Sequence, residues 1–209
     1  MIVNKKIGKN YLYYSEDDNE KESTCEQIVA SWDKAVNYVV EDTSKSQNGL
    51  REAQLGAIFA IRAHWIVSDS VATIVMPTGT GKTETMITTI VAEQFQKVFI
   101  LVPSDLLRKQ TVLTCAKLGI LKEVGIIDEK AKFPNVLLLK SKPDNIEEFE
   151  NALDSANVMV STAALVSKFS SEYMQILSDK CNVLIVDEEN HGFFTRKGIH
   201  LQSERKTIW

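Results

Sequence analysis

The feature that most constrains the fold is an alternation, from residue 50 onward, of short apolar runs with helix-like segments. Continuous apolar, β-branched runs of three to five residues are typical of strands that are buried on both faces. Such strands are expected at 71–75, 98–102, 136–139, 158–160 and 183–186, with a further one at 125–127. Helices are expected at 26–40, 50–67, 82–95, 105–118, 146–153 and 163–177.

Strands and helices in this order predict an α/β fold. Strand–helix–strand units connect parallel strands through right-handed crossovers, which place helices on both faces of the sheet. The predicted architecture is therefore a three-layer sandwich around a mostly parallel sheet. In such sheets ligands bind beyond the carboxyl ends of the strands, so the residues that follow each strand are the candidates for function.

Composition narrows the class of protein. Of the 209 residues, 44% are hydrophobic and 25% charged, as in an ordinary globular protein. The net charge of −4 argues against a wholly basic nucleic-acid coat but leaves room for a local basic groove. No apolar run approaches the roughly 18 residues that span a bilayer. The three cysteines lie far apart, so reduced thiols and a cytoplasmic location are expected.

The first 48 residues differ from the rest. Residues 16–22 form an acidic, loop-like run, and residues 41–49 are polar and end in Asn-Gly, a turn signal. We therefore expect an N-terminal appendage or linker at 1–48 and the main domain at 49–209.

The strand expected at 71–75 is followed by a glycine-rich segment, MPTGTGKTE (76–84). Glycines let the backbone curl so that successive N–H groups point into one concavity, and the following helix adds the positive end of its dipole. A lysine there places a charge on the β- and γ-phosphates, and a hydroxyl next to it can ligate Mg²⁺. A glycine-rich turn with a surface lysine is the alternative, and Met76 stands where the strict motif has glycine. The segment predicts a nucleotide-binding P-loop formed by Thr78, Gly79, Thr80, Gly81, Lys82, Thr83 and Glu84.

The strand expected at 183–186 is followed by two adjacent carboxylates, Asp187 and Glu188. Burying charge at a strand end is costly unless a metal or a proton-transfer role compensates. A P-loop needs such a partner, because one carboxylate holds Mg²⁺ while the other orients and deprotonates the attacking water. We assign Asp187 to the metal, and Glu188 together with Lys82 to catalysis.

With these motifs the sequence resembles the first RecA-like domain of superfamily 2 helicases, in particular the helicase module of type I and type III restriction enzymes and their DEAD/DEAH-box relatives. The resemblance covers roughly residues 50–194. It implies a RecA-like P-loop fold, ATP and Mg²⁺ as cofactors, ATP hydrolysis, and nucleic acid, DNA more than RNA, as partner. A role in restriction–modification is suggested by the family alone.

The resemblance also implies roles for residues outside the P-loop. Arg51 and Gln54 match the element that precedes the P-loop, in which the glutamine contacts adenine; a glutamine has the donor and acceptor for this, although a helix-surface position is the alternative. Backbone contacts to nucleic acid are expected from two segments after strands, where helix N-caps are a compatible reading. Their residues are Pro103, Ser104, Arg108 and Gln110 in the first and Ser161 and Thr162 in the second.

Two departures from the family pattern affect the expected activity. Asn190 stands where the family usually has His or Asp, with His191 one position later, which puts coupling of hydrolysis to nucleic acid in doubt. The sequence ends at Trp209, before the next helicase motif and the second RecA-like domain. We therefore expect ATP binding with weak hydrolysis by this chain, and a second lobe supplied in cis or in trans. A non-catalytic ATP-binding module is the alternative, and a small-molecule kinase is less favoured.

Overall fold

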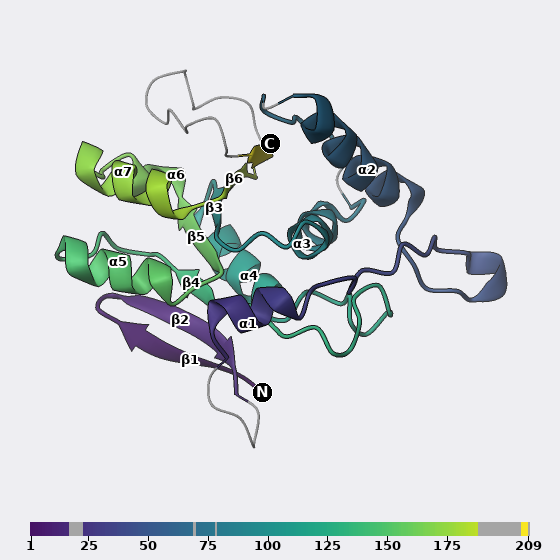
Figure 1. The fold of residues 1–209 in the computed structure, drawn as a ribbon, viewed down its shortest axis with the longest axis horizontal. Coiled ribbons are helices and arrows are strands. Elements are labelled where there is room, and N and C mark those ends of the chain that lie inside the picture. Colours follow the sequence, from purple (N-terminus) through teal and green to yellow (C-terminus); the bar gives the residue numbers. More distant parts are fainter. Residues whose placement is uncertain (17–22, 69, 78, 188–205, 209) are drawn as a thin grey trace.

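The computed structural model describes residues 1–16, 23–68, 70–77 and 79–187, together with the backbone of 206–208. Its described strands form one sheet in the order β1-β2-β4-β5-β3-β6-β7 (Figure 1). The strands are β1 (Ile2–Ile7), β2 (Asn10–Ser15), β3 (Val98–Val102), β4 (Val136–Leu138), β5 (Val158–Thr162), β6 (Val183–Val186) and β7 (Lys206–Ile208).

Most of the sheet is parallel. From β4 through β5, β3 and β6 to β7, every neighbouring pair runs in the same direction, whereas β2 pairs with β4 and β1 pairs with β2 in antiparallel fashion. The expected α/β fold with a mostly parallel sheet is therefore confirmed. The carboxyl ends of β3, β4, β5 and β6 lie along one edge of this sheet, which we call the strand-end edge.

The helices begin where the sequence supplies a capping side chain or a turn glycine. Thr24 and Gln27 form a reciprocal capping box, and Ser104, Asn145 and Thr162 each accept a backbone N–H of the helix that they precede. The helices are α1 (Cys25–Ala30), α2 (Glu52–Val67), α3 (Lys82–Ala92), α4 (Asp105–Ala116), α5 (Ile146–Asp154), α6 (Ala163–Val166) and α7 (Ser171–Lys180), with a 3₁₀ turn at Thr43–Lys45.

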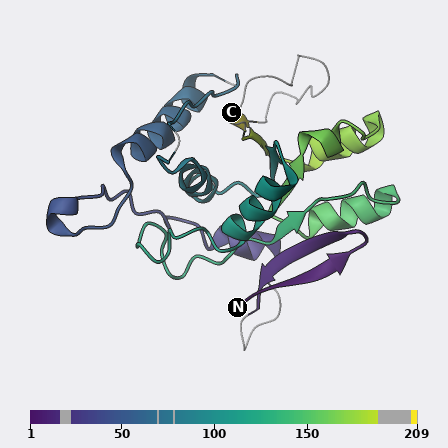
Figure 2. The ribbon, with the colours of Figure 1, turned by 180° about the vertical axis from the view of Figure 1, so that it is seen from behind.

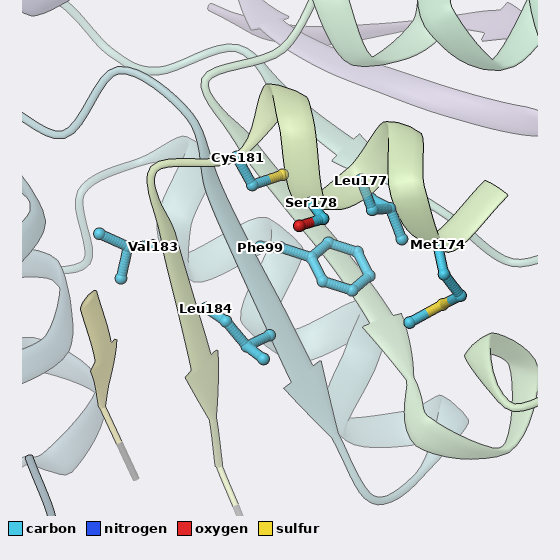
Figure 3. Close-up of a pocket in the computed structure, with 7 residues that line it drawn as sticks. All are labelled: Phe99, Met174, Leu177, Ser178, Cys181, Val183 and Leu184. Carbon is cyan, nitrogen blue, oxygen red and sulfur yellow. The ribbon is translucent and has the colours of Figure 1, made fainter. Parts of the chain in front are cut away.

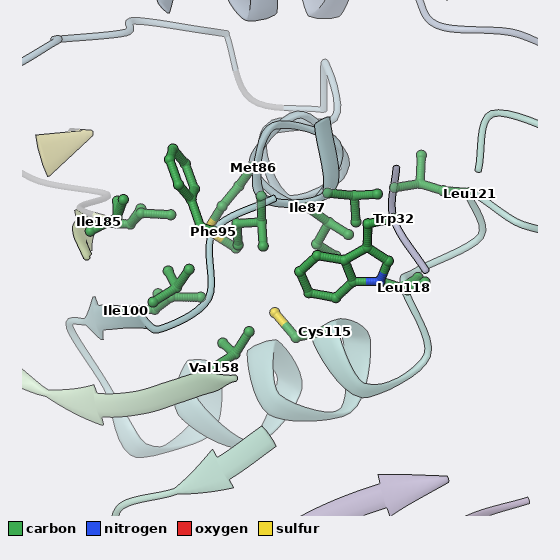
Figure 4. Packing of buried hydrophobic residues seen from close by; sticks show 14 of the residues in the cluster. Trp32, Met86, Ile87, Phe95, Ile100, Cys115, Leu118, Leu121, Val158 and Ile185 are labelled. Carbon is green, nitrogen blue, oxygen red and sulfur yellow. The ribbon is translucent and has the colours of Figure 1, made fainter. Parts of the chain in front are cut away.

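The sheet separates two hydrophobic layers. On one face lie α1, α2, α3 and α4. Ile87 of α3, Cys115 of α4 and Trp32, just after α1, belong to the same layer as Ile100 and Ile185 of the strands (Figure 4). On the other face, α5, α6 and α7 cover alternate residues of the same strands; Figure 1 and the reverse view in Figure 2 show these helices together on one side. Successive side chains along each strand point to opposite faces of the sheet, so the apolar residues of each strand pack into both layers.

Several expected elements differ from the structure. Residues 71–75 are not a strand: Val71 and Val75 are exposed, whereas Ala72 and Met76 are buried. Apolar, β-branched composition alone does not create a strand, because the ladder also needs a hydrogen-bonded neighbour. The helix expected at 26–40 ends at Ala30, and the one expected at 163–177 is divided into α6 and α7. At 125–127 there is an isolated bridge, Val36 to Ile127, and no strand.

Residues 2–15, which the sequence analysis placed in an appendage, form a β-hairpin that extends the sheet. Gly8 turns the chain with a positive φ of 56°, and β2 then pairs with β4, with Tyr11 opposite Leu138. Leu12 of this hairpin is fully buried in the layer formed by α5, α6 and α7. The hairpin is therefore built into the sheet.

Cys25, Cys115 and Cys181 are buried and form no disulfide, and Cys115 and Cys181 lie in the two hydrophobic layers. Burial raises the pKa of the Cys115 thiol to about 12, and burial likewise raises the pKa of Cys25 despite the nearby Lys97 ammonium. None of the described helices is both long enough and apolar enough to cross a bilayer.

Lys97 ties the start of β3 to the end of α5. Its Nζ donates to the carbonyl oxygens of Leu153, Asp154 and Ala156 at 2.8, 2.7 and 2.7 Å. A cation at a helix C-terminus neutralises the partial negative charge of carbonyls that have no partner within the helix.

Lys97→Met should lower the free energy of unfolding by about 2 kcal/mol, because it removes charge-assisted bonds from half-buried carbonyls while keeping the apolar stem. Urea unfolding followed by circular dichroism measures this change. Lys168→Met, at an exposed lysine, is the matched control and should change stability by less than about 0.5 kcal/mol. Equal stability of the two variants would contradict the assigned role.

Candidate nucleotide-binding site

The glycine-rich segment before α3 forms a tight curl. Gly79 and Gly81 have φ angles of 79° and 87°, in the left-handed region that glycine adopts without strain. Between them, Thr80 folds back, because its N–H and its hydroxyl both donate to the carbonyl of Pro77, at 3.3 and 2.6 Å. The curl expected from the sequence is present in the described residues 79–81.

The first turn of α3 is open at its N-terminus. Gly81 is the N-cap, so no side-chain oxygen accepts the N–H groups at the start of this 11-residue helix. These N–H groups carry the positive end of the helix dipole and are available to an external anion. Lys82, Thr83 and Glu84 stand in this turn and are half-buried. The arrangement suits a phosphate group better than a neutral ligand.

Arg51 and Gln54, which open α2, contact the curl directly. The Arg51 guanidinium donates to the carbonyl of Gly79 at 2.7 Å, and the Gln54 side-chain amide donates to the carbonyl of Gly81 at 3.2 Å. The Gln54 side-chain oxygen in turn accepts the backbone N–H of Arg51 at 2.9 Å. Gln54 is buried, so it is not the helix-surface glutamine of the alternative reading. The structure thus brings these two residues to the predicted P-loop.

Gly81 is also required by this contact. A Cβ atom at Gly81 would lie 2.2 Å from Nε2 of Gln54, closer than any ordinary contact. Any other residue would therefore push Gln54 away from the curl as well as strain the backbone.

The body of α3 holds the curl against the sheet. Its residues from Thr85 to Val91 are all buried. The hydroxyls of Thr85, Thr88 and Thr89 donate to carbonyls four residues earlier, at 2.8–3.0 Å, which satisfies them inside the apolar layer. Thr85 donates to Gly81 and so adds to the contacts that fix the curl. This role of Thr85 was not predicted from the sequence, although a threonine four residues after a glycine can donate its hydroxyl to the glycine carbonyl in a helix.

The acidic motif follows β6 as expected. The backbone N–H of Asp187 donates to the carbonyl of Leu101 at 2.8 Å, which continues the pairing of β6 with β3 by one residue. Asp187 therefore stands at the strand-end edge. Four residues of the sequence analysis, Thr78, Glu188, Asn190 and His191, lie outside the described residues.

The residues expected to contact nucleic acid divide into two groups. Pro103, Ser104 and Gln110 are exposed, and Ser104 and Thr162 are the N-caps of α4 and α6, as the sequence suggested. Arg108, Ser161 and Thr162 are buried. Arg108 and Ser161 both donate to the carbonyl of Leu139, at 3.3 and 3.1 Å.

Arg108 is engaged at two of its three nitrogens. Besides Leu139, its guanidinium pairs with Asp105 at 3.0 Å, and only 6% of its side chain is exposed. In this arrangement Arg108 joins α4 to the end of β4, and Ser161 joins β5 to the same carbonyl. The sequence motif shows only residue types. It could not predict that Arg108 and Ser161 are buried, because their exposure depends on how α4 and β5 pack at the sheet edge.

A small apolar pocket lies elsewhere. It is lined by residues of α7, β3 and β6 and of the short connections beside them (Figure 3), namely Phe99, Met174, Leu177, Ser178, Cys181, Val183 and Leu184. Its α7 residues belong to the layer opposite α3, and its lining offers one hydroxyl and no charged group. A triphosphate would find no partner there, so the curl before α3 is the better candidate for a nucleotide.

The chain is similar to a known family and to a solved structure. Residues 47–206, more than half of the chain, match the family described as type III restriction enzyme, res subunit (ResIII). No curated protein matches the chain. Among solved structures, the crystal structure of the UvsW helicase from bacteriophage T4 is similar, with 16% identity and a TM-score of 0.49. That similarity covers 91% of this chain and 61% of the UvsW chain.

The family match spans the curl, α3, the strands of the parallel sheet and the acidic motif after β6. This chain belongs to the family described as type III restriction enzyme, res subunit, whose helicase module its sequence resembles.

Proposed function

We propose that the chain is the ATP-binding lobe of a nucleic-acid-dependent ATPase that acts on DNA and works together with a second lobe. The observation that carries the proposal is the open N-terminus of α3 behind the left-handed Gly81, with Arg51 and Gln54 docked on the same curl. The uncapped start of α3 and Lys82 would recognise phosphate, and Gln54 beside them would recognise the base.

The residues present fit ATP. Backbone N–H groups of Gly81, Lys82 and Thr83 would donate to the phosphate oxygens, and the Lys82 ammonium would neutralise part of their charge. Gly79, Thr80 and Glu84 complete the curl, and Thr78 precedes it. Bound ATP supplies a phosphoanhydride bond whose hydrolysis releases energy.

Gln54 keeps the capacity to recognise adenine. Its amide nitrogen carries two hydrogens and its oxygen two lone pairs, of which one each is used on Gly81 and Arg51. One donor and one acceptor are left, which match the acceptor and donor on an adenine edge and oppose those of guanine. The same side chain would therefore link base identity to the shape of the P-loop.

Thr83 and Asp187 would hold Mg²⁺ together with phosphate oxygens. Within the described part of the chain no three His, Cys, Asp or Glu side chains gather to bind a metal by themselves, and Mg²⁺ commonly takes few protein ligands when phosphates supply the rest. Glu188 would orient the attacking water and accept its proton.

Nucleic acid would bind along the strand-end edge at the exposed Pro103 and Ser104, next to the buried N-cap Thr162, with Gln110 on the exposed side of α4. Arg108 and Ser161 would act indirectly, by fixing the end of β4 through Leu139. Closure of a second RecA-like lobe, in the same chain or in a partner, would add the remaining charge stabilisation for hydrolysis.

A non-catalytic ATP-binding module is the second candidate, and Asn190 in the acidic motif is the observation that favours it. The two functions separate on turnover: a motor lobe hydrolyses ATP faster with DNA once its second lobe is supplied, whereas a binding module shows affinity for ATP without hydrolysis.

Lys82→Ala and Glu188→Gln should fail at different steps. Lys82→Ala should weaken ATP–Mg²⁺ binding by about tenfold or more, because a charge-assisted contact is lost. Glu188→Gln should leave binding nearly unchanged and lower turnover by about 10²–10⁴-fold, because a general base is lost. Calorimetric titration and phosphate release measure the two, with the exposed Lys117→Ala as control. Wild-type behaviour of both variants would refute the assignments.

Gln54→Ala should reduce discrimination between ATP and GTP. In wild type we expect ATP to bind about five- to tenfold more tightly than GTP, since one or two neutral hydrogen bonds separate the two bases. In the variant the two affinities should approach each other. Gln175→Ala, on the exposed surface of α7, serves as control and should keep the preference. A preference for ATP that survives in Gln54→Ala would show that another residue reads the base.

A further inference from the structure

The N-terminal hairpin brings additional basic residues to the strand-end edge. Because β2 runs antiparallel to β4, the start of β2 and the turn at Gly8 lie beside the carboxyl end of β4. Asn10 fixes this junction: it is buried, and its side-chain oxygen accepts the backbone N–H groups of Lys140 and Ser141 at 2.9 and 3.0 Å. The hairpin tip and the segment after β4 therefore form one rigid unit.

Exposed lysines and one tyrosine gather on this unit. Lys6 stands opposite Tyr11 in the hairpin register, and the Lys140 ammonium lies 4.7 Å from the centre of the Tyr11 ring. Lys142 lies next along the chain, 4.5 Å from the ring of Tyr173. Lys6, Lys140 and Lys142 are exposed, and none of them makes an ion pair with another described residue. We call Lys6, Tyr11 and Lys140 the hairpin track; Lys142, over Tyr173, belongs to the opposite face.

The acidic groups nearby belong to the other side of the turn. Asp144 pairs with Lys9, and the carboxylate of Glu148, in the first turn of α5, lies against Gly8. Tyr11 instead belongs to the face that α4 covers, as does Leu138 opposite it. The side chains of Lys6 and Lys140, which accompany Tyr11, are therefore separated from these carboxylates by the sheet edge.

We propose that the hairpin track is a second nucleic-acid contact, which extends the strand-end edge so that the phosphates of a single strand continue from α4 and α6 onto the N-terminal hairpin. The proposal rests on the nucleic-acid-binding function proposed above, and it adds Lys6 and Tyr11, which precede the family match that begins at residue 47. Lysine ammonium groups beside an aromatic ring are suited to a phosphate backbone with adjacent bases.

The geometry of the sheet supports a continuous path. From β3, which precedes Ser104, the order β5, β4, β2 and β1 follows without a break. Neighbouring strands are about 4.8 Å apart, so the path covers roughly 19 Å. At about 3.4 Å per nucleotide this length corresponds to roughly five or six nucleotides. The exposed N-cap Ser104 and the hairpin track thus lie within reach of one short strand.

A competing reading gives the lysines a protective role. Lysines on an edge strand oppose pairing with another sheet and need no ligand. That reading explains Lys6, which is on the edge strand β1, but it does not explain Lys140, which follows the interior strand β4.

The test compares two double variants of the full chain. Lys6→Gln/Lys140→Gln removes two charges from the hairpin track, and Lys117→Gln/Lys130→Gln removes two exposed charges at the opposite edge, after α4 and before β4. Substitutions are preferable to deletion of the hairpin, since Leu12 is buried in the core. Binding of a fluorescent twelve-nucleotide single-stranded DNA is measured by anisotropy between 50 and 200 mM salt, and ATP binding is measured in parallel.

The track variant should bind the oligonucleotide about tenfold more weakly at 50 mM salt, with a slope of log K against log salt reduced by about 1.4. The control variant should bind like wild type, and ATP affinity should be unchanged in both.

Equal oligonucleotide binding by the two variants, or equal losses in both, would overturn the track while leaving the proposed function intact. Displacement of the oligonucleotide by an equally charged polyglutamate at the same concentration would also overturn it, in favour of an acidic protein partner. No binding by wild type would overturn the track together with the nucleic-acid function, whereas loss of ATP binding alone would count only against the proposed nucleotide site.

Discussion

The carbonyl of Gly81 is the interaction on which the site depends. It accepts the Gln54 amide, the Thr85 hydroxyl and the Thr85 backbone N–H, so that α2, the curl and the first turn of α3 share one oxygen. The arrangement is available because Gly81 adopts a left-handed backbone conformation and has no Cβ in the place that Gln54 occupies. The N–H groups of the helix start then face outward, while the carbonyl side is fully engaged. A phosphate cradle results from this division of donors and acceptors.

A second carbonyl has the same organising role at the strand-end edge. The Leu139 oxygen receives Arg108 from α4 and Ser161 from β5, and Asn10 from the hairpin holds the next two backbone N–H groups. These bonds join four segments that are distant in the sequence into one rigid edge. Arg108 and Ser161, which the family pattern would place against nucleic acid, thus shape the surface. Their neighbours Pro103 and Ser104 are exposed and can bind a ligand. The apolar pocket beside α7 has no such carbonyl-centred set of polar contacts among its lining residues.

Much of the fold follows from local sequence, and its failures have physical causes. The runs at 98–102 and 183–186 match their strands to the residue, since strands buried on both faces need continuous apolar side chains. Residues 71–75 have similar composition but form only an isolated bridge at Ala72, because a ladder depends on a neighbouring strand that composition does not specify. The hairpin was missed although Gly8 between two β-rich runs is a turn signal. In the site, residue types in the P-loop were readable, whereas the burial of Arg108 and the contact of Gln54 with Gly81 depend on tertiary packing.

The most direct measurement of the central claim is a backbone amide titration by NMR spectroscopy with ADP and Mg²⁺. Phosphates that bind at the start of α3 should move the amide resonances of Gly79, Gly81, Lys82 and Thr83 most, towards lower field, because these N–H groups would become donors to charged oxygens. Largest shifts at Phe99, Leu177 or Leu184, or no shifts at saturating nucleotide, would show that the curl is not a phosphate site.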